Sequence, residues 1–357
     1  MRNRAAGAVM GALIGDALGL GCHWYYDLAE LRRDFGPWIS DYTTPRPGRY
    51  HDGMKAGQLS QSGLILVMLL ESVLENGEYI EADFTGRLDE ELFPHLDGTP
   101  ANGPGGYTSQ SIREAWRRRV LEKKSWQETG GHADTTEAAE RAIVLAARYA
   151  ADPGKVASLV SSNVLLTQGD EAIVAMSTAY NCVLSLLVSG ERLEPGISGK
   201  LMTLVQKGKL PFHSVVRENF LPPRPGDPDP PRAGRFSSPD ALLTPHYAAL
   251  AAVDPGISIE PAWKASLVYG MPCAIYHQLP AAYYLASRFP DDFESAVLHA
   301  INGGGQNMSR AMLTGALVGA QVGLSGIPER FIEGLENGRR LAELARELGR
   351  LAAGEIS

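Results

Sequence analysis

The stretch from Asn302 to Arg310 carries the most unusual polar set in the chain. It reads Asn-Gly-Gly-Gly-Gln-Asn-Met-Ser-Arg and leads directly into an apolar segment. Successive glycines allow backbone conformations that side chains forbid. A loop that enters a helix N-terminus presents free N–H groups to an anion. We therefore predict a ligand-binding loop, and its candidate residues are Asn302, Gly304, Gly305, Gln306, Asn307, Ser309 and Arg310. The alternative is a glycine turn in which Asn307 caps the helix.

Two further groups could contact a ligand. Ser60, Gln61 and Ser62 precede the amphipathic segment 64–74 as a small polar set, and Ser62 could equally be a helix cap. His23 and Trp24 lie before the first long loop, and His51 lies within it. A histidine among aromatic residues could stack on a ring of a ligand, or it could simply anchor the loop.

Three aspartates are the candidate acids or bases. Asp16 interrupts the first apolar run, whereas Asp134 and Asp170 lie in short polar turns at expected helix starts, where capping is their other role. The chain contains no HExxH, GxSxG or Walker motif. No pair of carboxylates is recognisable as an acid and base set.

We expect helices to position these residues. Apolar residues recur along the chain about every 3.6 residues, and no segment alternates apolar and polar residues as a strand does. We predict an all-α, single-domain orthogonal helical bundle over 1–357. The expected helices span 4–20, 62–77, 81–92, 108–123, 136–151, 155–162, 170–190, 194–207, 238–252, 259–268, 274–288, 291–301, 308–323 and 328–352. A proline-rich surface loop at 221–237 is interpreted as an insertion, with a domain boundary as the alternative.

Glycine is over-represented, with 39 residues where average usage predicts roughly 25. Gly7, Gly11, Gly15 and Gly19 fall on one face of the first helix, and Gly315 and Gly319 are spaced in the same way near the C-terminus. Glycine inside a helix costs up to about 1 kcal/mol relative to alanine. We predict that this cost is offset by close packing of these two helices.

Composition restricts the partners and the compartment. The net charge of −8 argues against nucleic acid and acidic membranes. Three widely separated cysteines favour a reducing, cytoplasmic location. The apolar run 5–20 is interpreted as a buried helix, with a removed signal peptide as the alternative. We expect a small-molecule ligand, no nucleic acid and no membrane, and the oligomeric state is left open.

The chain resembles the ADP-ribosylglycohydrolase superfamily, which includes the J-crystallins. The resemblance is carried by Gly11-Ala-Leu-Ile-Gly-Asp-Ala-Leu-Gly19, Leu69-Leu-Glu-Ser72, Leu166-Thr-Gln-Gly-Asp170, Asn302-Gly-Gly-Gly, Thr314-Gly-Ala-Leu-Val-Gly-Ala320 and Gly326-Ile-Pro-Glu-Arg. It spans nearly the whole chain and implies an all-α domain with a central cleft. The loop at 302–310 and the histidine–aromatic pairs look most like the J-crystallin branch.

The resemblance also implies two magnesium ions, held by acidic segments before the second helix and before the late glycine helix. In this chain the first segment falls on Ser60-Gln61-Ser62-Gly63. The second falls on 307–310 or 306–309, depending on the direction of counting, and the acids are absent in both registers. Magnesium prefers carboxylate oxygens, and Arg310 could bring a positive charge near the same place. We therefore expect no metal and no cofactor.

Two functions follow from this resemblance. The favoured one is a divergent hydrolase, or a related enzyme, that acts on a glycosidic or other small polar ligand of ADP-ribosyl-like type without the dinuclear magnesium site. Asp16, Asp134 or Asp170 would then be the acid or base. The alternative is a non-catalytic member that serves as a binding or structural protein.

Overall fold

The computed structural model describes residues 1–213, 224–227 and 234–356, and it confirms the all-α class. Within these residues the only β-type contacts are two isolated bridges, Gly131 with Gln168 and Phe212 with Phe236. The α-helices are α1 (Arg2–Leu20), α2 (Leu28–Phe35), α3 (Gln61–Asn76), α4 (Glu81–Arg87), α5 (Gln110–Trp116), α6 (Glu137–Arg141), α7 (Ile143–Arg148), α8 (Pro153–Leu165), α9 (Glu171–Val188), α10 (Ile197–Gln206), α11 (Asp240–Val253), α12 (Ala265–Tyr269), α13 (Ile275–Arg288), α14 (Phe293–Asn302), α15 (Asn307–Val322), α16 (Glu329–Gly334) and α17 (Gly338–Ala352).

Short π and 3₁₀ turns complete the helical content. Helices α4 and α5 continue into π-turns at Leu88–Leu92 and Arg117–Leu121. The 3₁₀ turns are η2 (Phe93–His95), η4 (Trp126–Glu128), η5 (Ala262–Lys264) and η6 (Leu324–Gly326).

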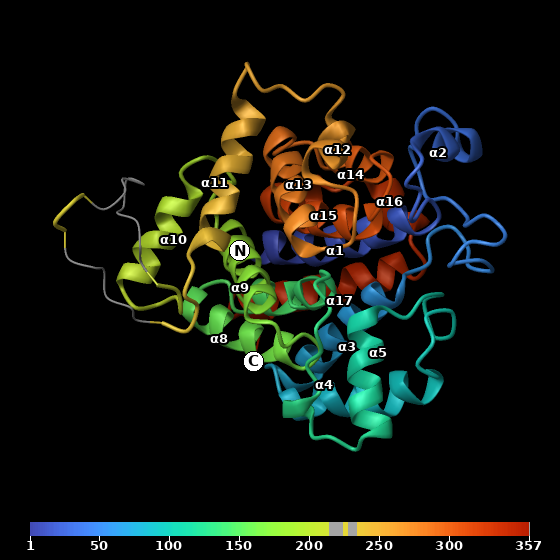
Figure 1. The fold of residues 1–357 in the computed structure, drawn as a ribbon, viewed down its shortest axis with the longest axis horizontal. Coiled ribbons are helices and arrows are strands. Elements are labelled where there is room, and N and C mark those ends of the chain that lie inside the picture. The colour runs from blue at the N-terminus through green and yellow to red at the C-terminus, as the bar shows by residue number, and fades with distance from the viewer. Residues whose placement is uncertain (214–223, 228–233, 357) are drawn as a thin grey trace.

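Helix α1 lies at the centre of the molecule, with α15 packed along one side and α17 along another (Figure 1). Residues 5–20 of α1 are all buried, which agrees with the prediction of a buried helix. A β-carbon built on Gly11 would overlap the carbonyl oxygen of Gly315, and one on Gly7 would overlap that of Gly319. The two helices therefore run antiparallel in backbone contact. The predicted role of the packing glycines is confirmed.

Several predicted helices are shorter than expected. The segment 136–151 divides at Ala142, whose ψ of −8° ends α6 before α7 begins. The segment 328–352 divides before α17, because Asn337 adopts the left-handed conformation with φ of +55°. The segment 259–268 is helical only from Ala262, since Pro261 precedes η5. One helix, α2, is present where none was predicted. Asp27 caps it by accepting from the N–H of Ala29 at 2.8 Å.

Helix α9 is the one described helix that is long and apolar enough to cross a membrane, and 78% of it is buried inside the molecule. It packs against α8, α7 and α15 as a core helix does. Most of the predicted loop at 221–237 lies outside the described residues, which here cover 224–227 and 234–237. The single-domain organisation stays a prediction.

Candidate functional site

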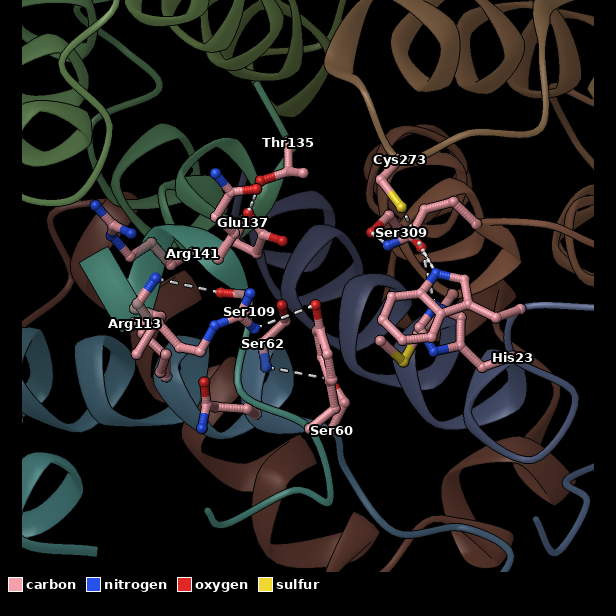
Figure 2. A pocket seen from close by; sticks show the side chains of 18 of the residues that line it. His23, Ser60, Ser62, Ser109, Arg113, Thr135, Glu137, Arg141, Cys273 and Ser309 are labelled. Atoms are coloured by element: carbon pink, nitrogen blue, oxygen red, sulfur yellow. Dashed lines mark hydrogen bonds between the residues drawn. The ribbon is translucent and has the colours of Figure 1, made fainter. Parts of the chain in front are cut away.

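A cavity of about 200 Å³ opens where the N-terminal ends of α3, α5, α6 and α15 meet the loop that follows α1. Figure 2 shows His23, Cys273 and Ser309 on one side of it, with Arg113, Glu137 and Arg141 on the other. The predicted residues that line the cavity are His23, Trp24, His51, Ser60, Gln61, Ser62, Asp134, Gln306 and Ser309. Segments from both ends of the sequence are thus brought together.

Gln306 is the centre of the first wall. Its Oε1 accepts from the indole Nε1 of Trp24 and lies 3.0 Å from Nε2 of His23 and 3.4 Å from Sγ of Cys273. Its Nε2 donates to Oγ of Ser309 at 2.8 Å. The amide therefore joins the loop after α1 to the first turn of α15.

His23 and His51 form a buried pair, with Nδ1 of His23 and Nε2 of His51 2.8 Å apart. Burial lowers the pKa of His51 to about 4. Burial, together with the neighbouring His51, lowers the pKa of His23 well below its ordinary 6.5. Trp24 stacks on His23, and the ring of Tyr107 meets Trp24 edge-on with centroids 4.5 Å apart. This wall is therefore largely aromatic.

The second wall carries a carboxyl group that the sequence analysis did not identify. Glu137 accepts from Oγ of Ser111 at 3.1 Å and from the hydroxyl of Thr135. Burial, with an added contribution from the nearby Glu140, raises the pKa of Glu137 to about 7. A carboxyl group with this pKa is protonated in an appreciable fraction of molecules at neutral pH, as a general acid must be.

Glu140 lies one turn further along α6 and is fully buried. Its Oε1 accepts from the hydroxyl of Thr136 at 2.6 Å, and its Oε2 has no hydrogen-bond partner. Burial raises the pKa of Glu140, so its acid form is favoured. Two neighbouring carboxyl groups with raised pKa values titrate as a coupled pair. This pair was not recognisable in the sequence.

Asp16, the first of the candidate acids or bases, does not line the cavity. It is fully buried behind Ser60, from which it accepts two bonds, N–H to Oδ2 at 2.8 Å and Oγ–H to Oδ1 at 2.5 Å. Ser60 caps α3 by accepting from the N–H of Ser62. Burial raises the pKa of Asp16 to about 7. Asp16 thus positions the start of α3, and its role as acid or base stays a prediction.

The other two aspartates differ in position. Asp134 lines the cavity, is exposed, and accepts from the hydroxyl of Tyr276 at 3.1 Å. Asp170 lies outside the cavity lining and caps α9, accepting from the N–H of Ala172 at 2.9 Å. The structure shows the capping role that was the alternative for Asp170, and a catalytic role for it stays a prediction.

Most of the glycine loop also lies outside the cavity lining, and ligand binding by these residues stays a prediction. Asn302 bonds both backbone groups of Ile39, and Asn307 donates to the carbonyl oxygen of Cys22. Gly304 and Gly305 adopt φ of +63° and +60°, a conformation that glycine adopts readily. These residues shape the turn, and only Gln306, Met308 and Ser309 from it reach the cavity.

Arg310 is fully buried and is a structural residue as well. Its guanidinium donates to the carbonyl oxygens of Ala300, at 3.0 Å, and Gly304. Burial lowers its pKa to about 10. The capping alternative for Asn307 fails too, because Gln306 is the cap residue and Asn307 begins α15.

The comparisons with known proteins agree with this architecture. The ADP-ribosylglycohydrolase profile matches residues 1–356. The chain belongs to the ADP-ribosylglycohydrolase family. One relative is an uncharacterized protein of Archaeoglobus fulgidus, 25% identical over 352 residues, covering 98% of this chain and 96% of the other. Crystallin J1A of Tripedalia cystophora is 23% identical over 369 residues, covering 98% and 97%.

A solved structure of an ADP-ribosylglycohydrolase-related protein complex has a similar fold. Its TM-score is 0.61 at 19% sequence identity, and 98% of each chain is covered. At this identity the likeness shows the fold alone.

The donor set at the cavity does not fit the two magnesium ions that the family resemblance implies. The positions expected to hold the acids carry Ser60, Gln61 and Ser62 at the start of α3, with Gln306 and Ser309 at the start of α15. Within the described ranges no group of three histidine, cysteine or acidic side chains is arranged to hold a metal ion. Neutral amides and hydroxyls lack the carboxylate charge that magnesium sites supply.

The lining residues that were not predicted include Tyr107, Ser109, Gln110, Arg113, Thr135, Glu137, Arg141 and Cys273. One signal could have identified the glutamates. Glu137 and Glu140 flank two alanines in a segment that continues as Arg-Ala-Ile-Val-Leu-Ala-Ala. An acidic residue in so apolar a helix is expected in the core, where burial of its charge costs free energy. Such a residue is therefore a candidate for a functional role. The spacing of three residues also puts both on one face.

Proposed function

We propose that this protein hydrolyses a glycosidic bond of an ADP-ribosyl-like ligand, with Glu137 as acid and base and without a dinuclear magnesium site. The observation that carries the proposal is the carboxyl group of Glu137. It lines the cavity and has a pKa raised to about 7 by burial. Membership of the ADP-ribosylglycohydrolase family supports the substrate class.

The reaction requires one proton transfer to the leaving group and one proton transfer from the attacking water. In the first step the protonated Glu137 donates its proton to the leaving-group atom as the bond to the sugar carbon breaks. Water adds to that carbon, and the Glu137 carboxylate accepts the proton released from the water. Ser111 and Thr135 both donate to this carboxyl group, which keeps it oriented through the cycle.

The ligand would lie between the two walls. Trp24 and Tyr107 offer aromatic surface for a ring, and Arg113 supplies a guanidinium that already bonds the carbonyl oxygen of Thr108. A guanidinium suits a phosphate or ribose oxygen. Gln61 has a buried Oε1 without a hydrogen-bond partner, which a ligand hydroxyl could satisfy.

The proposal is tested by assaying purified protein, treated with EDTA, on ADP-ribosylated arginine and ADP-ribosylated serine peptides. We expect release of ADP-ribose from at least one substrate and an unchanged rate when magnesium is restored. No release in either condition would contradict the proposal.

The alternative function is a non-catalytic binding or structural protein. The likeness to crystallin J1A favours this alternative, because the name crystallin denotes a structural protein of the lens and no reaction. The same assay separates the two, because a non-catalytic member releases nothing while calorimetry still detects ADP-ribose binding to the cavity. In both cases the proposed partner is a small molecule rather than nucleic acid or a membrane, and the proposed location is the cytoplasm.

A further inference from the structure

His23 and His51 form a chain of three hydrogen-bond contacts that ends at both sides on an amide or peptide oxygen, which can only accept a hydrogen bond. Nδ1 of His51 lies 3.1 Å from the carbonyl oxygen of Gly105, and Nε2 of His51 lies 2.8 Å from Nδ1 of His23. Nε2 of His23 then lies 3.0 Å from Oε1 of Gln306. Three contacts therefore each require a proton on an imidazole nitrogen.

Two neutral imidazoles carry only two N–H protons between them. One of the three contacts would then bring two lone pairs together. Rotating the amide of Gln306 by half a turn does not remove the conflict. It would point the NH₂ group at His23, but the indole N–H of Trp24, which is a donor only, would then face that same NH₂ group.

We propose that His23 and His51 together hold three protons, so that the pair carries one positive charge and fixes the position of Gln306. The third proton completes all three hydrogen bonds at once. Trp24 stacks on His23 with ring centroids 4.4 Å apart and an interplanar angle of 25°, which stabilises a cationic imidazole. Burial opposes this charge by lowering both pKa values, and by itself it would leave the pair neutral at pH 6. The pair keeps the third proton at that pH because the three hydrogen bonds require it.

The titratable and charged groups around the pair lie in the two pockets that it lines. The groups that line the main cavity with it are Cys273, Tyr107, Arg113, Asp134, Glu137 and Arg141. Tyr26, Arg49 and Tyr50 line a second pocket with it. The three guanidinium groups oppose a positive charge on the pair, and the two carboxyl groups favour it when they are ionised.

The test uses the full-length protein labelled with ¹⁵N-histidine. Long-range ¹H–¹⁵N spectra distinguish protonated from unprotonated ring nitrogens, and assignment comes from His23→Gln and His51→Gln. We expect three protonated nitrogens in the pair at pH 6. Two protonated nitrogens at that pH would overturn the inference.

Two further variants separate this inference from a merely structural role. Gln306→Glu places a carboxylate against His23 and Trp24, and we expect the third proton to be lost at a pH higher by about one unit. Trp24→Phe frees the amide to rotate, and we expect the third proton to be lost at a lower pH. Unchanged titration in both variants would overturn the proposal. These spectra are recorded without substrate, so they do not depend on the proposed hydrolysis.

Discussion

Replacing Gly11 with alanine is expected to destabilise the protein by at least about 3 kcal/mol, or to prevent it from folding, because backbone rather than a movable side chain meets the new methyl group. The added carbon would overlap the carbonyl carbon and oxygen of Gly315. Relief would require α1 and α15 to separate, and both helices are buried along nearly their whole length. Thermal denaturation of the soluble fraction measures the loss.

The matched control is Gly86→Ala in α4. A β-carbon on Gly86 meets nothing within 4 Å, and Gly86 is also inside a helix. Alanine is the better helix former, so we expect Gly86→Ala to be neutral or to stabilise by up to about 1 kcal/mol. If Gly11→Ala melted at the wild-type temperature, the close packing of α1 on α15 would be refuted.

Replacing Glu137 with glutamine is expected to lower kcat/KM by about 10²- to 10⁴-fold, the usual contribution of a general acid or base. Glutamine is similar in size and keeps an oxygen to accept from Ser111 and Thr135, so the protein should fold normally. In the wild type the acid form is lost as the pH rises through about 7, so kcat/KM should fall above that pH. Steady-state kinetics between pH 5.5 and 8.5 measure both effects.

Asp170→Asn is the control for this prediction. It makes the same change from carboxylate to amide at a helix cap outside the cavity, and asparagine caps as well as aspartate. We expect the activity of Asp170→Asn to equal that of the wild type. Full activity in Glu137→Gln would show that Glu137 is not the acid or base.

The sequence was most informative where a local pattern has a steric cause. Four glycines at intervals of four residues predict a helix face without side chains, and the backbone contact of Gly11 with Gly315 follows from it. Predictions of helix ends were poorer. The interruptions at Ala142 and Asn337 depend on the dihedral angles of single residues, which periodicity does not record.

Part of the candidate site could be predicted, because some of its residues are close together in the sequence. Polar residues in a short segment, such as Ser60 to Ser62, are visible in the sequence, and they do line the cavity. Asp16 is equally conspicuous but is used to hold Ser60, which only tertiary contacts reveal. Glu137 was missed because glutamate on a helix is usually solvated. Its raised pKa arises from burial among segments far apart in the chain.

The central claim is that this chain keeps the ADP-ribosylglycohydrolase fold while its cavity works without the dinuclear magnesium site. Isothermal titration calorimetry of the EDTA-treated protein with magnesium chloride, with and without ADP-ribose, tests it most directly. Hydroxyls and amides at the expected ligand positions predict no saturable heat of magnesium binding in either titration, and no effect of magnesium on ADP-ribose affinity. Tight binding of two magnesium ions per chain would contradict the account.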